Sequence, residues 1–334
     1  MNNVNLTEEY FEGAVSFEKA EGHIKPWRLP FRELALFPSN NNSLVGCAEM
    51  PAGVRIRFAT AAPEVKLSFL PVPKTADPLR LDCVIDNDLI DTVALCEGQE
   101  EIAFKGLPGK DKTVEIWLSP LMGLSLKSLH TGSRIFLSPD MRKKWTTYGS
   151  SITHCRGAHS PAQTWPAIAA RAGNLNLTCL GFGGQCHMDP MVARLIRDLP
   201  ADFISLKLGI NIQGGATMSA RTFKPMVIGM VKIIREKHPD VPIAIVSPII
   251  SPPRETKPNN AGMSLSFMRE ELQDAVKRLK ECGDANIHYF NGLDLLGEAD
   301  VSSCLQPDLV HPHGDGYRTI GERFARIILP KIKI

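Results

Sequence analysis

The sequence predicts an antiparallel β-sandwich followed by an α/β domain with a parallel sheet. A length of 334 residues is sufficient for two domains, each with its own hydrophobic core. From about residue 30 to residue 138, apolar and polar residues alternate with period two. After Ser138 to Lys144, near-continuous apolar strands alternate with helical segments instead. We therefore predict a β-sandwich domain at residues 1–140 and an α/β domain at residues 141–334.

Short strands that bury one face characterise the first half. Three of them are Val54 to Phe58, Val65 to Phe69 and Val114 to Leu118. Turn-forming residues separate the strands, and Asp86-Asn87-Asp88 indicates a hairpin. Many short strands, with no convincing amphipathic helix between them, are typical of an antiparallel sandwich or jelly roll.

Buried strands and helices alternate strictly in the second half. Predicted strands lie at residues 145–149, 175–180, 203–208, 243–246 and 287–290. Predicted helices begin at Pro161 with Ser160 as the cap, run through residues 191–199, 223–236 and 263–281, and begin again after His313-Gly314. Such alternation implies a parallel sheet covered on both faces, which binds ligands beyond the C-terminal ends of its strands.

The composition excludes several classes of function. Lys and Arg total 38 against 36 Asp and Glu, with no long basic run, so nucleic acid is not an expected partner. No segment approaches ~18 uninterrupted apolar residues and the N-terminus lacks a signal-peptide pattern, so we expect no membrane association and a cytoplasmic location. The eight cysteines form no C-x-x-C pair, which favours reduced and mostly buried thiols.

Four short motifs in the second half carry groups that acyl transfer requires. Ser151 follows a predicted strand, where its hydroxyl is accessible to a substrate carbonyl. Gly184 ends a glycine-rich loop whose backbone can approach a substrate. Asn211 ends the third strand with a side-chain amide donor. Asp308 and His311 are separated by two residues, so the carboxylate can orient the imidazole as a general base.

Each motif alone also has a simpler interpretation. Ser150-Ser151 is compatible with an ordinary polar turn, Asn211 with a turn residue, and Asp308 to Pro312 with a helix cap. A glycine-rich loop can bind phosphate, but no Gly-Lys-Ser/Thr follows Gly184. The histidines near the motifs, which are His154, His159, His187 and His313, show no His-x-x-x-His spacing, so a metal is not expected. Cys155 is a competing nucleophile candidate.

Together and in this order, the motifs resemble the four blocks of the SGNH (GDSL-like) serine hydrolase family. The resemblance covers residues 145–334 and implies a flavodoxin-like three-layer α/β/α domain that needs no cofactor and no metal. It assigns the catalytic roles to Ser151, Asp308 and His311. It assigns the oxyanion hole to the N–H groups of Ser151 and Gly184 and to the side chain of Asn211. The chain departs from the family pattern at Ser150 and Ile212, where the family has Asp, and at Gln185, where it often has Asn.

An N-terminal β-sandwich before such a domain resembles the architecture of two-domain carbohydrate esterases and of related small-molecule acyltransferases. The resemblance therefore implies a serine esterase that removes a short acyl group, such as acetyl, from a sugar or another small alcohol. An acyltransferase with the same residues and a carbohydrate-binding protein with an inactive hydrolase domain remain alternatives. The expected partner is a small-molecule or carbohydrate ester, and the sequence does not define the oligomeric state.

Overall fold

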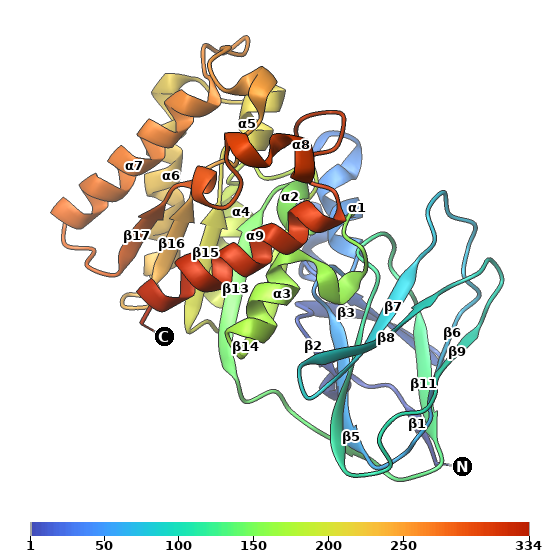
Figure 1. Cartoon of the computed structure of the whole chain (residues 1–334). Coiled ribbons are helices and arrows are strands. Elements are labelled where there is room, and N and C mark those ends of the chain that lie inside the picture. Colours follow the sequence, from blue (N-terminus) through green and yellow to red (C-terminus); the bar gives the residue numbers. More distant parts are fainter. Residues whose placement is uncertain (1, 334) are drawn as a thin grey trace. The chain divides into compact units, whose positions relative to one another are not determined.

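The computed structural model describes residues 2–333 and divides them into two compact units. Of the described residues, unit 1 comprises 2–34, 45–142 and 160–162, and unit 2 comprises 35–44, 143–159 and 163–333. The short segment 35–44 thus belongs to the unit that contains the parallel sheet, although it precedes most of unit 1 in the sequence. Figure 1 shows the elements of each unit.

Unit 1 contains two antiparallel sheets that enclose one hydrophobic core. The first has the order β3 (Ser16–Ala20), β4 (His23–Trp27), β11 (Leu126–Thr131), β6 (Val65–Phe69) and β9 (Glu101–Phe104), and β1 (Asn2–Asn5) also pairs with β11. The second has the order β12 (Ile135–Leu137), β5 (Arg55–Thr60), β10 (Lys112–Trp117), β7 (Arg80–Ile85) and β8 (Asp88–Ala94), and β2 (Phe11–Glu12) also pairs with β5.

These sheets confirm the predicted antiparallel sandwich. The period-two pattern works as expected, because Val65, Leu67 and Phe69 on β6 are fully buried while the residues between them are half-buried. The predicted hairpin joins β7 to β8. Strands β1 to β4 precede the region in which the alternation was recognised, since their short and mixed sequences carry little periodic signal.

Unit 2 contains a parallel sheet with the order β14 (Leu175–Gly181), β13 (Lys143–Gly149), β15 (Phe203–Lys207), β16 (Ile243–Val246) and β17 (Ile287–Phe290). In order of appearance along the chain this is 2-1-3-4-5, the flavodoxin-like arrangement, so the predicted α/β fold is confirmed. In such a sheet the direction of connection reverses next to the first strand, and the crevice at that point binds ligands. The nucleophile candidate follows this strand, β13.

The α-helices of the described residues are α1 (Ser43–Glu49), α2 (Ser151–His154), α3 (Trp165–Ala172), α4 (Pro190–Asp198), α5 (Ile210–Gly215), α6 (Ala220–Arg235), α7 (Leu265–Glu281), α8 (Val301–Cys304) and α9 (Gly314–Ile327). Helices α3 and α9 lie side by side (Figure 1). Their Trp165 and Phe324 rings pack with Trp145 of β13, with 5.0 Å between the ring centroids of Trp145 and Phe324. Burial of these aromatic rings fixes the two helices against the sheet.

One predicted helix start was wrong. Ser160 is not the cap of α3; its hydroxyl donates a hydrogen bond to Asp82, at 2.6 Å. Residues Pro161–Gln163 form a short 3₁₀ turn, and α3 begins at Trp165 with Thr164 as its cap. Both Ser160 and Thr164 are good N-cap residues, so local preference alone did not distinguish them. None of the helices within residues 2–333 has the length and the apolar character that are needed to cross a bilayer.

Candidate active site

The sequence around Ser151 makes a sharp turn at the C-terminal end of β13. Ser151 is the first residue of α2, and Ser150 caps this helix by accepting a hydrogen bond from the N–H of Ile152 at 3.2 Å. Gly149 is needed because a β-carbon there would collide with the Thr153 hydroxyl. Ser150 therefore supports the turn at the position where the family has Asp.

Ser151, His311 and Asp308 form a chain of hydrogen bonds. Ser151 Oγ lies 2.8 Å from His311 Nε2, and His311 Nδ1 lies 2.6 Å from Asp308 Oδ2. If Nδ1–H donates to the carboxylate, Nε2 is left as the acceptor for the Ser151 hydroxyl. This tautomer is the one that a general base requires.

Asp308 is held as a carboxylate by several donors. Burial alone would raise its pKa, but the hydrogen bonds from the His311 side chain and from the backbone N–H groups of His311 and Val310 lower the pKa to about 2. Both backbone bonds reach Asp308 Oδ1 at 3.0 Å. One oxygen of the carboxylate thus fixes the loop and the other orients the imidazole, so the two residues lie in a defined relative geometry.

Three hydrogen-bond donors belong to residues that line one cleft. They are the N–H of Ser151, the N–H of Gly184 and the side-chain amide of Asn211, and none of them donates a hydrogen bond to a described residue. Asn211 Oδ1 accepts a hydrogen bond from the N–H of Cys186 at 3.0 Å, so Nδ2 is the atom left to donate. Gly184 has a φ of 73°, a conformation that favours glycine.

His187 braces the loop that carries Gly184. Its Nε2 lies 3.0 Å from the Gly184 carbonyl oxygen, and its Nδ1 lies 3.0 Å from Thr217 Oγ1. Holding the carbonyl at this position orients the peptide plane that precedes Gln185. Of the four histidines near the motifs, His187 lines the cleft, whereas His154, His159 and His313 do not.

The cleft has a volume of about 570 Å³ and lies wholly within unit 2. Besides the predicted groups, its walls are formed by Asn40, Gln185, Ile210, Gly214, Gly215, Thr217, Arg254 and Val310. No sequence motif indicated Asn40, because it lies more than a hundred residues before Ser151. No sequence pattern indicated Arg254 as a pocket residue either, since a single Arg in a loop is normally solvated.

The competing nucleophile and metal candidates lie elsewhere. Cys155 is fully buried, and burial raises the pKa of its thiol well above the usual value, which disfavours the reactive thiolate. His159 pairs with Asp315, and His313 caps α9. Within residues 2–333, no group of three or more His, Cys, Asp or Glu side chains is arranged to hold a metal ion. Six of the eight cysteines are buried, as expected.

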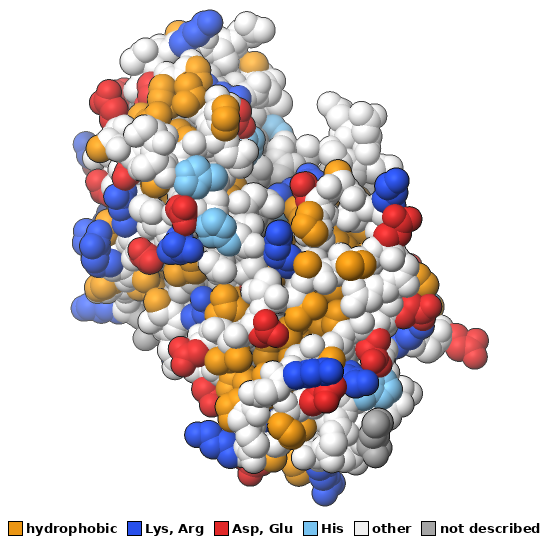
Figure 2. Space-filling view, turned by 45° about the vertical axis from the view of Figure 1, so that its right-hand side comes forward, with side chains coloured by type: hydrophobic (Ala, Val, Ile, Leu, Met, Phe, Trp, Pro, Cys, Tyr) orange, Lys and Arg blue, Asp and Glu red, His pale blue; other side chains and the backbone are white. Residues whose placement is uncertain are grey.

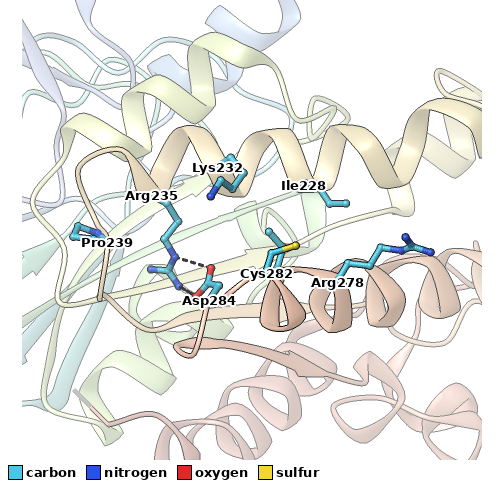
Figure 3. Close-up of a pocket in the computed structure, with 9 residues that line it drawn as sticks. Ile228, Lys232, Arg235, Pro239, Arg278, Cys282 and Asp284 are labelled. Carbon is cyan, nitrogen blue, oxygen red and sulfur yellow. Dashed lines mark hydrogen bonds and ion pairs between the residues drawn. The ribbon is translucent and has the colours of Figure 1, made fainter.

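A second cavity, of about 600 Å³, lies between α6 and α7 (Figure 3). Two of its basic groups are paired: Arg235 Nε lies 2.8 Å from Asp284, and Arg278 Nε lies 2.7 Å from Asp274. Cys282 lines this cavity, and no histidine does. A nucleophile without a base does not match acyl-transfer chemistry.

On the face shown in Figure 2, basic and acidic side chains are interspersed.

This fold and this arrangement of groups define a class, the SGNH-type acyl hydrolases and acyltransferases. A model of the GDSL-like lipase/acylhydrolase family matches residues 142–329, and the chain belongs to this family. A second family model, of the SsfX3 N-terminal domain, matches residues 9–127. No curated protein matches the sequence.

Among solved structures, the chain is similar to salicylyl-acyltransferase SsfX3 from a tetracycline biosynthetic pathway, with 33% identity over 98% of both chains and a TM-score of 0.90. It also resembles a protein from Bacteroides ovatus named for its likeness to GDSL lipases, with 21% identity over 100% of this chain and 99% of that chain and a TM-score of 0.77. A family two carbohydrate esterase from Clostridium thermocellum has 14% identity over 99% of both chains and a TM-score of 0.71. The latter two similarities concern the fold alone.

Proposed function

We propose that this protein is a serine esterase that hydrolyses a short-chain carboxylic ester, such as the acetyl ester of a sugar or another small alcohol. The observation that carries this proposal is the hydrogen-bonded chain from Ser151 through His311 to Asp308, at 2.8 Å and 2.6 Å, in a cleft with three free donors. A nucleophile, an oriented base and oxyanion donors form the minimum set for acyl transfer.

In the proposed reaction, Ser151 Oγ attacks the ester carbonyl carbon and its proton passes to His311 Nε2. Negative charge develops on the carbonyl oxygen, where the N–H groups of Ser151 and Gly184 and the Asn211 amide stabilise it. The C–O bond to the alcohol then breaks, and His311 returns the proton to the departing alkoxide oxygen. Asp308 stabilises the imidazolium while it carries the proton.

Deacylation repeats these steps with water. His311 accepts a proton from a water molecule, whose oxygen attacks the acyl-Ser151 carbonyl, and the proton then returns to Ser151 Oγ as the carboxylic acid leaves. The side chains of His311 and Asp308 are 37% and 46% exposed, so water has access to the base. This exposure supports hydrolysis as the fate of the acyl group.

Transfer of the acyl group to a small-molecule alcohol is the second candidate. It is favoured by the 33% identity to salicylyl-acyltransferase SsfX3 over 98% of this chain. The same residues would act, with an acceptor hydroxyl in the place of water. The distinction between the two reactions depends on which nucleophile reaches the acyl-Ser151 intermediate first.

Two measurements on the full chain test these proposals. The protein should hydrolyse p-nitrophenyl acetate, and a fluorophosphonate should phosphonylate Ser151 Oγ with loss of fluoride; an adduct on another residue, or no activity above a Ser151→Ala control, would contradict the esterase proposal. Increasing concentrations of glycerol or xylose should then be added while both products are quantified. Mostly free acetate supports a hydrolase, whereas mostly acetylated acceptor supports a transferase.

A further inference from the structure

Arg254 is a guanidinium without a protein partner in the wall of the catalytic cleft. It is half-buried, and no described residue forms a hydrogen bond or an ion pair with its guanidinium group. The adjacent carboxylate is already used, because Glu255 pairs with Arg269 at 2.6 Å and accepts the N–H of Ser251. The five N–H donors of Arg254 are therefore free for a ligand.

The loop that carries Arg254 is fixed to the loops on both sides of it. The buried Ser251 donates its hydroxyl to the Leu309 carbonyl, at 2.8 Å, in the loop that holds Asp308 and His311. Asn259 donates its side-chain amide to the carbonyl of Gln213 in α5, also at 2.8 Å. These anchors hold the Arg254 backbone in register with the catalytic residues, so less side-chain and loop entropy is lost when a ligand binds.

Gly214 leaves the space that the guanidinium occupies. A β-carbon on Gly214 would lie 2.9 Å from Arg254 Nη1, closer than ordinary van der Waals contact. The guanidinium is thus packed against the backbone of α5, in the wall that also carries Asn211. This contact restricts the direction in which Arg254 points.

The described side chains that line the cleft include a positive charge and no negative charge. Among the described residues that line it, Arg254 has the only permanently charged side chain, and no carboxylate lines the cleft. A positive group with no counter-charge in a partly dry cleft attracts an anion. A guanidinium pairs with a carboxylate through two parallel hydrogen bonds, and a single positive charge matches the single charge of a carboxylate.

We propose that Arg254 binds a carboxylate on the substrate, so that the preferred ester carries an anionic group on either its acyl or its alcohol part. This inference rests on the proposed esterase or acyltransferase activity of the same cleft. Arg254 acts as a specificity-determining residue, and the step at Ser151 does not require it. Esters without a carboxylate are therefore substrates too, but with a lower kcat/KM.

Two matched pairs of esters test this proposal. For the acyl part, p-nitrophenyl hydrogen adipate is compared with its methyl ester; for the alcohol part, 4-acetoxybenzoate is compared with 4-acetoxybenzamide. The wild-type protein should prefer the carboxylate in one pair, and Arg254→Gln should lower kcat/KM for that ester about 10- to 100-fold, mainly through KM, because a charge-assisted hydrogen bond is lost. The matched neutral ester should change less than about twofold.

Three further variants make the outcome decisive. Arg254→Lys should keep part of the preference, and Gly214→Ala should reduce it by displacing the guanidinium. Arg326→Gln serves as the charge control, because Arg326 is exposed in the last turn of α9 and does not line the cleft. Equal rates for both members of both pairs, or an equal loss on charged and neutral esters in Arg254→Gln, would overturn the proposal.

A binding measurement separates this inference from the proposed activity. With the Ser151→Ala variant, the NMR signals of 4-hydroxybenzoate should broaden more on addition of protein than those of 4-hydroxybenzamide. The additional substitution Arg254→Gln should remove this difference. Carboxylate binding without esterase activity would refute the proposed function and keep the inference. Esterase activity without any carboxylate preference, or equal binding of 4-hydroxybenzoate and 4-hydroxybenzamide, would refute the inference about Arg254 and leave the proposed function standing.

Discussion

Unit 1 and unit 2 each contain carboxylates paired with basic groups, but in opposite environments. In unit 1, Arg55 Nη2 lies 2.9 Å from Asp140 Oδ2, and both side chains are 0% exposed. Arg142 joins Asp140 to Glu115, at 2.6 Å from the latter. In unit 2, the side chains of Asp308 and His311 lie 2.6 Å apart and are 46% and 37% exposed.

The difference separates a structural role from a chemical one. Burial alone would raise the pKa of Asp140, but the Arg142 hydrogen bond and the charges of Arg55 and Arg142 lower it overall. Loss of any partner there leaves an uncompensated buried charge. An exposed pair contributes little to stability, so the Asp308–His311 pair can change protonation during a reaction without unfolding the domain.

The largest expected effect belongs to the exposed cluster. Ser151→Ala should lower kcat by about 10⁴-fold or more, because nucleophile, base and orienting carboxylate act as a unit. The free energy of unfolding should change by less than about 1 kcal/mol, since only one partly exposed hydrogen bond is lost. Steady-state kinetics and urea denaturation measure the two quantities.

Ser150→Ala is the matched control for this substitution. It removes the cap of α2 and should cost about 1 kcal/mol in stability, while Ser151 keeps its hydroxyl. If Ser150→Ala lost as much kcat as Ser151→Ala, the effect would come from the turn and not from a nucleophile.

The buried cluster should show the opposite balance. Asp140→Ala should lower the free energy of unfolding by about 3–5 kcal/mol, because Arg55 is left buried without this partner's charge. Activity per folded molecule should remain within about twofold. Asp198→Asn is the control, since its ion pairs with Arg197 and Lys237 lie at the surface, where such pairs contribute little to stability. Equal destabilisation by the two variants would contradict the distinction.

Asn211 should affect the rate and leave substrate binding nearly unchanged. Asn211→Ala should lower kcat about 10²- to 10³-fold with a smaller change in KM, because its hydrogen bond matters most when charge develops on the oxygen. Asn211→Asp keeps the shape and the acceptor for the Cys186 N–H but loses the donor, so it should be at least as impaired. A change in KM alone would make Asn211 a substrate-binding residue instead.

The pH profile sharpens the comparison further. A pKa of about 2 keeps Asp308 ionised above pH ~4, so it adds no limb to the profile there. Activity on p-nitrophenyl acetate should rise with pH and depend on the loss of a single proton, because a general base acts only when it is unprotonated. A flat profile from pH 5 to 9, or a two-proton dependence, would contradict this assignment.

The fold could be predicted from the sequence because its periodicities are strong and local. Val65 to Phe69 alternates cleanly, and Phe203 to Lys207 is continuously buried, so each pattern indicates its kind of sheet. The Ser160 cap was wrong because Thr164 offers the same local chemistry four residues later. Boundaries that depend on tertiary hydrogen bonds, such as the one from Ser160 to Asp82, have no local signal.

The residues of the candidate site also fall into two groups, those that the sequence predicted and those that it did not. Ser151, Gly184, Asn211 and His311 were found because each lies in a short motif, and the structure places all four around one cleft. Asn40 and Arg254 were not found, since only the tertiary fold brings them to that cleft. Motifs thus identify the proposed reacting groups, whereas the residues proposed to select a substrate depend on loop geometry.

The smallest expected effect concerns the segment of the N-terminal half that joins unit 2. Asn40, within residues 35–44, lines the cleft as part of unit 2. Asn40 is exposed, so Asn40→Ala should leave stability within about 0.5 kcal/mol. Asn40→Ala should lower kcat/KM for larger esters about two- to fivefold, because one exposed hydrogen bond to the substrate is lost. The rate on p-nitrophenyl acetate should not change, because this small ester does not extend to Asn40. Asn42→Ala, a neighbour that does not line the cleft, is the control, and kinetics over a series of esters provides the measurement. Identical selectivity in wild type and Asn40→Ala would show that the segment 35–44 contributes no substrate contact through this side chain.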